Sequence, residues 1–208
     1  EATDIISAVV MGRCHDVRVR KCPMADGGEA TSSILGRILG YRKTVVKGYD
    51  CLMRPVEVEC HVAADKSEAI VDSSGVIGLQ MISTGDRDPW MATSWPLGDI
   101  VNKLIESGVG HVTVGVGGTA TVDCGLGFLQ ALGCGIFTSE GRLDRQLRAG
   151  DLLSVTRVEL PATFPSVSGV SDVDVPLLDD DDRISMLSFA AQKGVTGEEL
   201  VVLKKSVE

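Results

Sequence analysis

The sequence is poor in aromatic residues and in positive charge. Only 4% of its 208 residues are Phe, Trp or Tyr, and 20 Lys and Arg stand against 29 Asp and Glu, for a formal net charge of −9. A nucleic acid or an anionic membrane is bound through a basic patch, so this charge balance argues against both partners. Hydrophobic residues still make up 44% of the chain, which predicts a globular protein with a core of aliphatic side chains.

Patterns typical of metal sites and disulfide frameworks are also missing. The six cysteines form no Cys-x-x-Cys pair, and the three histidines lack the spacing of metal ligands. No apolar run is long enough to span a bilayer, and no signal peptide is recognisable. We therefore expect reduced cysteines and a cytoplasmic protein. We interpret the acidic run at 179–182 as a solvated loop rather than a metal site, because successive side chains of a run point in different directions.

The hydrophobic pattern alternates between helices and short strands, which is typical of an α/β fold. Its periodicity predicts helices at about 4–13, 29–39, 97–107, 125–132 and 198–205. Strands are expected at about 16–25, 43–47, 56–64, 68–72, 111–116, 134–142, 157–160 and 167–173. The strand at 56–64 alternates strictly between apolar and polar residues, which indicates an antiparallel meander with one wet face. From residue 42 onward the pattern predicts successive strands, and this change indicates that a second domain begins there.

The most informative segment is the glycine-rich stretch 114–127, VGVGGTATVDCGLG. A buried strand runs into paired glycines and hydroxyls, and then into a helix. Glycine lets backbone N–H groups approach an anion, and a helix N-terminus adds free donors and a positive dipole end. Neither the Walker A pattern nor the dinucleotide fingerprint is present. The segment therefore predicts either phosphate binding or a merely tight turn, and phosphate binding would use Gly117, Gly118, Thr119 and Thr121.

Asp123 lies within this segment, where a carboxylate would repel a bound phosphate. The repulsion is relieved if a cation lies between the two groups, or if the carboxylate acts on a proton. Asp123 is thus a candidate Mg²⁺ ligand or a candidate base for a substrate hydroxyl. The alternative is that Asp123 caps the following helix, a position that Asp favours. The residues alone leave both interpretations open.

A second glycine motif is found in MADGGEAT at 24–31. Asp26 ends a predicted strand and is followed by Gly27 and Gly28, at the position where open α/β sheets bind ligands. Asp26 could hold a metal or a substrate. It could equally cap the next helix, with Glu29 as a favourable charge in the first turn.

Isolated polar residues complete the candidate set. Arg87, in a polar loop at 86–94, could hold a carboxylate through two hydrogen bonds, or it could be an ordinary surface residue. Gln192 and Lys193 offer an amide and a cation before a flexible Gly194. Asp172 lies at the end of a predicted strand and adds a further carboxylate.

Taken in order, five segments resemble the family of glycerate kinases that yields 2-phosphoglycerate: MADGGEAT (24–31), DRDPWMATS (86–94), GVGGTATVDCGLGFLQALG (115–133), SDVDVPLL (171–178) and AQKGVT (191–196). The resemblance implies phosphorylation of D-glycerate by ATP with Mg²⁺. It also implies a two-domain α/β enzyme, in which a second α+β domain is inserted into a Rossmann-like three-layer domain and the active site lies between them. Residues 1–41 would then be part of the Rossmann-like domain, 42–178 the inserted domain and 179–208 a return segment.

On the premise of this resemblance, we infer the roles of the candidate residues from their chemistry. Catalytic roles fall on Asp123, Asp26 and Lys193. Binding of substrate and phosphate falls on Gly27, Gly28, Arg87, Gly117, Gly118, Thr119, Thr121 and Gln192, and metal binding on Asp123 and Asp172. The implied partners are glycerate and ATP, and a homodimer is an open alternative to a monomer.

Several positions depart from the family pattern. Ala30 and Cys124 stand where glycine is usual, and Asp72 stands where glutamate is usual. Nothing matches the N-terminal strand with its Asp-Ser-Phe-Lys-Gly-like motif, and the family continues past residue 208, so we expect both parts to be absent from this chain. The competing expectation is therefore an inactive fragment, or a non-catalytic module that binds a nucleotide or an anion.

Overall fold

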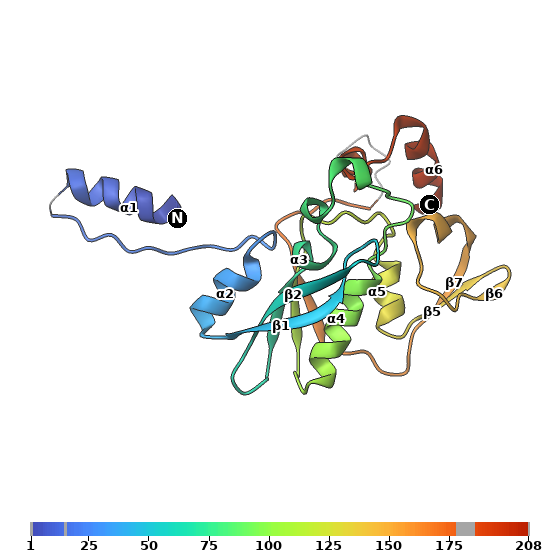
Figure 1. The fold of residues 1–208 in the computed structure, drawn as a ribbon, viewed down its shortest axis with the longest axis horizontal. Helices are drawn as coiled ribbons and strands as arrows, with labels where there is room; N and C mark the ends of the chain where they lie inside the picture. The colour runs from blue at the N-terminus through green and yellow to red at the C-terminus, as the bar shows by residue number, and fades with distance from the viewer. Residues whose placement is uncertain (1, 15, 178–185, 208) are drawn as a thin grey trace.

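The computed structural model describes residues 2–14, 16–177 and 186–207 (Figure 1). Its centre is a five-stranded sheet with the strand order β1-β2-β3-β4-β8. The strands are β1 (Arg42–Tyr49), β2 (Pro55–Val62), β3 (Ala69–Asp72), β4 (Val112–Gly115) and β8 (Val167–Val170). β1, β2 and β3 pair antiparallel, whereas β3, β4 and β8 pair parallel. The α/β class expected from the sequence is confirmed.

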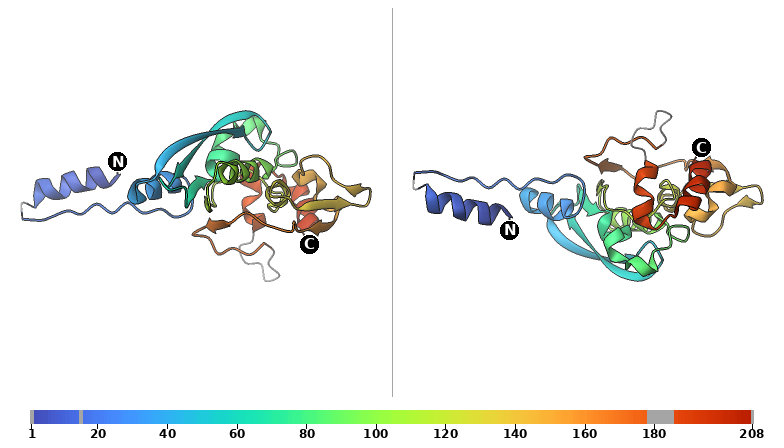
Figure 2. Two further views of the ribbon diagram at one scale, coloured as in Figure 1. Left: turned by 90° about the horizontal axis from the view of Figure 1, so that it is seen from below. Right: turned by 90° about the horizontal axis from the view of Figure 1, so that it is seen from above.

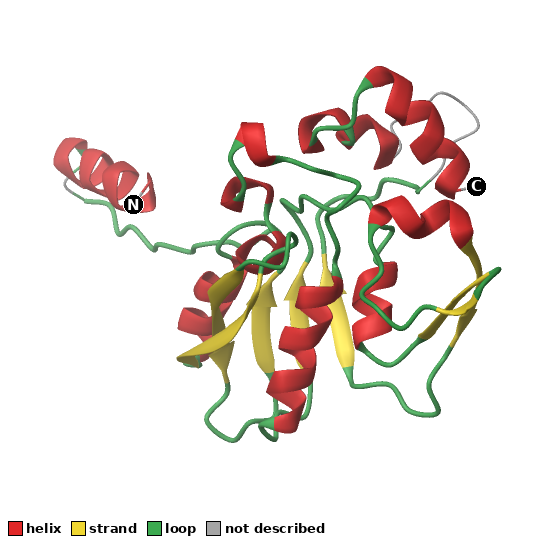
Figure 3. Ribbon diagram, turned by 45° about the vertical axis from the view of Figure 1, so that its right-hand side comes forward, coloured by secondary structure: helices red, strands yellow, loops and turns green. Residues whose placement is uncertain are grey.

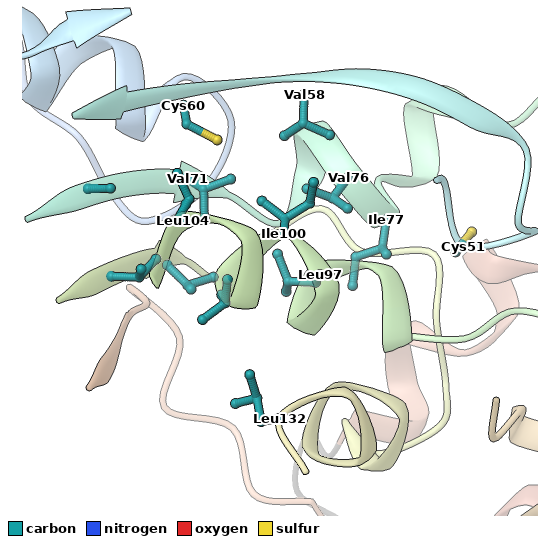
Figure 4. Packing of buried hydrophobic residues seen from close by; sticks show 14 of the residues in the cluster. Cys51, Val58, Cys60, Val71, Val76, Ile77, Leu97, Ile100, Leu104 and Leu132 are labelled. Carbon is teal, nitrogen blue, oxygen red and sulfur yellow. The ribbon is translucent and has the colours of Figure 1, made fainter. Parts of the chain in front are cut away.

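Two helices cover opposite faces of this sheet. The main helix, α4 (Trp95–Glu106), places Leu97, Ile100, Val101 and Leu104 on one buried stripe, the spacing expected of an amphipathic helix. Figure 4 shows Leu97, Ile100 and Leu104 of this stripe near Val58 and Val71 of the sheet. α2 (Thr31–Leu39) covers the other face, where its Gly36 lies against the ring of His61.

A smaller sheet, with the order β6-β5-β7, packs beside α5 (Leu126–Ala131). Its strands are β5 (Gly135–Thr138), β6 (Gly141–Arg142) and β7 (Val155–Glu159). A separate cluster of buried side chains contains Val122, Leu152 and Leu203, and Leu203 belongs to α6 (Gly197–Val207). The short helices are α3 (Ser74–Ile77), η1 (Leu79–Met81), η2 (Thr84–Asp86), η3 (Ala149–Ser154), η4 (Met186–Phe189) and η5 (Ala191–Lys193).

The N-terminal part of the chain extends away from this body. α1 (Ala2–Arg13) and the segment after it project to one side in all three views (Figures 1 and 2). The strand predicted at 16–25 is wrong, since residues 17–26 form neither helix nor strand. Val17 and Met24 are exposed, so the apolar side chains that suggested a buried strand do not pack against a sheet.

Other expectations about organisation have mixed outcomes. The division into domains at 1–41, 42–178 and 179–208 stays a prediction. The acidic run at 179–182 lies outside the described residues. Within the part that the structure describes, no helix has the length and apolar character needed to cross a membrane.

The arrangement of the sheet fixes where a ligand can meet the chain. Because β3, β4 and β8 are parallel, their carboxyl ends lie at one edge, and Figure 3 shows loops gathered above that edge. Open α/β sheets bind ligands at this edge. Both glycine motifs predicted from the sequence lie there.

Candidate active site

The two glycine motifs touch each other through their backbones. A methyl group on Gly117 would lie 2.9 Å from Gly28 Cα, and one on Gly115 would lie 2.9 Å from Gly27 O. Gly27 has φ +93°, and a methyl group there would lie only 2.4 Å from Val170 O. Glycine is therefore required at these positions because three chain segments approach one another closely. At Gly27 the left-handed backbone conformation requires it as well. The structure brings Gly27, Gly28, Gly117 and Gly118 together at the sheet edge.

Ser73, the residue after β3, holds the second glycine loop in place. Its hydroxyl donates to Gly117 O at 3.0 Å and accepts the Gly117 N–H at 3.1 Å. Its own N–H donates to Gly115 O at 2.9 Å. Ser73 was not predicted from the sequence, because a serine after a short strand carries no signal of its own.

Asp72, just before it, ties α2 to the sheet. Its two carboxylate oxygens accept hydrogen bonds from the Ser32 N–H at 2.7 Å and the Ser32 hydroxyl at 2.9 Å. Burial raises the pKa of Asp72, although the bonds from Ser32 oppose the shift. The sequence pointed to Asp72 only through its position, where the family that the sequence resembles usually has a glutamate.

Lys193 reaches the glycine-rich loop from a distant part of the chain. Its Nζ donates to Thr119 Oγ1 at 3.2 Å and to Thr121 O at 2.7 Å. Burial lowers the pKa of Lys193, while the nearby Asp123 opposes that shift. A cation enclosed beside two threonines and a glycine turn is a suitable partner for a phosphate group.

Asp123 is fully buried, and donors surround its carboxylate. Its Oδ2 accepts hydrogen bonds from the N–H and the hydroxyl of Ser94, both at 2.7 Å, and from the Gly127 N–H at 3.3 Å. Its Oδ1 accepts the Gly125 N–H at 3.3 Å. Burial raises the pKa of Asp123 in spite of these donors. The arrangement fits capping of α5 better than Mg²⁺ binding, because the oxygens are already used.

The other candidate residues lie apart or face solvent. Asp26 is exposed, and its Oδ1 accepts the Gly28 N–H at 2.9 Å. Arg87 donates to Gln192 O at 2.9 Å and so steadies the segment that carries Lys193. Asp172 is exposed. Among the described residues, no three Asp, Glu, His or Cys side chains come together as a group that could hold a metal.

Two cavities flank the joined glycine loops. One, of about 410 Å³, is lined by aliphatic and aromatic side chains, with Lys193, Thr119 and Thr121 also in its wall. Burial raises the pKa of Cys124, another lining residue, to about 11, so its thiol stays un-ionised at neutral pH. The other cavity, of about 350 Å³, is lined by the carboxylates of Glu29, Glu59 and Asp72 and by serine hydroxyls.

The two departures from glycine noted in the sequence fall on strained backbone. Ala30 has φ 65° and Cys124 has φ 53°, a left-handed conformation that costs about 1–2 kcal/mol for a residue with a side chain. We expect Ala30→Gly to raise the free energy of unfolding by about 0.5–1 kcal/mol, since relief of strain exceeds the added entropy of the unfolded chain. The control is Ala162→Gly at an exposed position without positive φ, where urea denaturation should show a small loss. A loss of equal size in both variants would contradict the strain at Ala30.

Comparison with known proteins gives a consistent result. The model of the glycerate kinase family matches residues 1–208. A glycerate kinase from Halalkalibacterium halodurans is 31% identical over 183 residues, which cover 85% of this chain and 47% of that protein. Glycerate 2-kinase from Escherichia coli is 27% identical over 199 residues, covering 92% of this chain and 51% of that protein. The chain thus spans about half the length of the curated relatives it matches.

A solved structure extends the similarity to the fold. A crystal structure attributed to glycerate kinase 2 from Salmonella typhimurium LT2 superposes with a TM-score of 0.77 at 26% sequence identity. The match covers 98% of this chain and 56% of that one.

Proposed function

The chain belongs to the glycerate kinase family, and from this premise we propose that it carries out phosphorylation of D-glycerate by ATP to give 2-phosphoglycerate. The observation that carries the proposal is the meeting of two glycine loops and an enclosed lysine at one edge of the sheet. Phosphoryl transfer depends mainly on positioning and on stabilisation of negative charge. Backbone N–H groups beside a half-buried cation supply both.

Each group has a proposed task in this reaction. The Gly118 N–H would hold a phosphate oxygen, because the Gly117 N–H already donates to the Ser73 hydroxyl. Lys193 would offset the charge of the group being transferred. The acceptor hydroxyl would lose its proton to Asp26, which faces solvent, rather than to Asp123, whose oxygens already accept four hydrogen bonds.

Mg²⁺, when present, would screen the charge of the nucleotide phosphates. Since Asp123 is enclosed and Asp172 is exposed, we propose that the ion arrives with ATP rather than in a preformed site on the chain. We also propose a cytoplasmic location, and a homodimer stays a prediction.

Lys193 offers the most direct test among these residues. We expect Lys193→Met to lower the rate of ATP consumption with D-glycerate on the order of 10²-fold, as is typical when a charge-stabilising donor is removed. Lys204→Met is the matched control, because Lys204 is exposed on α6. The measurement is a coupled assay of ADP release, with thermal unfolding recorded for each variant.

Two outcomes would revise the proposal in different ways. Undiminished turnover in Lys193→Met would remove that residue from the mechanism. ATP binding without any glycerate-dependent turnover in the unmodified protein would instead favour the alternative, a non-catalytic nucleotide-binding module.

A further inference from the structure

The cavity of about 410 Å³ beside the glycine-rich loop has two unlike sets of walls. We propose that its apolar part binds the aromatic base of the nucleotide, with the phosphates directed toward Lys193. This inference rests on the proposed function, because it assigns one substrate of that reaction to one cavity.

The apolar walls come from both the sheet and the helices. On the sheet side, the walls are Val114 of β4, Val116 just after β4, and Val167 of β8. On the helix side, they are Leu97 of α4 and Phe128 of α5. The volume falls within the range of about 300–1,000 Å³ typical of small-molecule sites, which are mostly apolar with a few placed polar groups. These walls therefore suit a ligand with a sizeable apolar surface.

Of the two proposed substrates, only the nucleotide has such a surface. Glycerate carries an oxygen on each of its three carbons, so it would leave the valine and phenylalanine walls without a partner. A nucleobase has two apolar faces, and burying these faces in such a cavity costs little desolvation. The apolar walls thus select the base over the acceptor.

The polar groups of the same cavity set the direction of the nucleotide. Lys193 Nζ lies within hydrogen-bond distance of Thr119 Oγ1 and of the backbone carbonyl Thr121 O, so a cation lies beside a hydroxyl in the part of the glycine loop that leads to α5. The neighbouring cavity of about 350 Å³ instead presents Glu29, Glu59 and Asp72. These three carboxylates would repel a triphosphate. The cavity beside Lys193 is lined by one carboxylate, Asp123, whose charge is offset by four hydrogen-bond donors and by the nearby Lys193, so this cavity suits the phosphates better.

Val116 and Val170 provide a matched pair for the test. The Val116 N–H donates to Val170 O at 2.8 Å, so the residues are neighbours, and their side chains are 45% and 37% exposed. Val116 lines the cavity, whereas Val170 is not among its lining residues. A phenylalanine at either position is therefore tolerated to a similar degree, but only the one at 116 occupies the proposed base site.

The experiment measures dissociation constants by calorimetry for adenosine, for ATP and for tripolyphosphate, each with Mg²⁺. We expect Val116→Phe to weaken adenosine and ATP at least tenfold and to leave tripolyphosphate within twofold, and Val170→Phe to leave all three unchanged. Lys193→Met should show the opposite pattern, with tripolyphosphate and ATP weakened and adenosine retained. If Val116→Phe lost tripolyphosphate as well, the smaller Val116→Met would be compared in the same way.

Failure of this inference can be told apart from failure of the proposed function. Unchanged adenosine affinity in Val116→Phe, or ATP bound by the unmodified protein no more tightly than tripolyphosphate, would overturn the base site while kinase activity stood. If the unmodified protein bound neither ATP nor tripolyphosphate, both the base site and the proposed function would be overturned.

Discussion

Replacing Asp123 by Ala is expected to lower the free energy of unfolding by about 3–4 kcal/mol. The substitution leaves the N–H groups of Ser94, Gly125 and Gly127 without their acceptor in the interior. Each buried donor that loses its partner costs about 1–3 kcal/mol, with part of that recovered by relaxation or by entering water. Urea denaturation followed by circular dichroism measures the change.

Asp172→Ala is the control, because this carboxylate is exposed, and it should change stability by less than about 0.5 kcal/mol. Asp123→Asn should be milder than Asp123→Ala, since an amide oxygen in the place of Oδ2 keeps most of the bonds. A loss below about 1 kcal/mol for Asp123→Ala would contradict the capping role that we assign to this residue.

The raised pKa of Asp123 adds a dependence on pH. Because burial raises this pKa above its ordinary 3.8, the folded protein binds the proton more tightly than the unfolded chain does. That contribution to stability is present below 3.8 and is lost as pH rises through the folded pKa. Asp123→Asn should remove this part of the pH dependence, and denaturation curves recorded between pH 3.5 and 7 would show whether it does.

Replacing Gly27 by Ala is expected to cost about 3 kcal/mol or more and to reduce the proposed activity. The new methyl group would lie 2.4 Å from Val170 O, a backbone atom that cannot move without displacing β8. Overpacking of this kind costs about 1–3 kcal/mol, and the left-handed backbone adds about 1–2 kcal/mol for a residue with a side chain.

Gly40→Ala separates these two contributions. Gly40 also has a left-handed backbone, with φ +72°, but nothing lies within 4 Å of an added methyl group. We expect this control to lose about 1 kcal/mol, from the backbone alone. Equal losses in the two variants would show that the contact between Gly27 and β8 is not the constraint that we describe.

The elements of the fold were predicted well wherever hydrophobic periodicity was strong. The helix expected at 97–107 is found as Trp95–Glu106, and the strand expected at 56–64 as Pro55–Val62. Both present an apolar face to the same core, so local pattern and tertiary packing agree. The segment at 16–25 has apolar side chains without a neighbouring strand, and a sequence pattern alone does not tell whether a partner strand exists.

The candidate site was predicted in part. The place of the second glycine motif follows from its position after β4, because the parallel strands end at a common edge. The first motif follows no strand in the structure, so its contact with Gly117 arises from tertiary packing. The hydrogen bonds of Ser73 and Asp72 described above join residues that are 40 or more positions apart in the sequence. The apolar cavity likewise depends on side chains from several elements that are far apart in the sequence. Such features arise only when the chain is folded.

The most direct test of the central claim is ³¹P NMR of the protein with Mg²⁺, ATP and D-glycerate. We predict that ADP and 2-phosphoglycerate accumulate in equal amounts, and that neither forms when D-glycerate is omitted. ATP bound without turnover, or a phosphate carried on the other hydroxyl of glycerate, would contradict the proposed reaction.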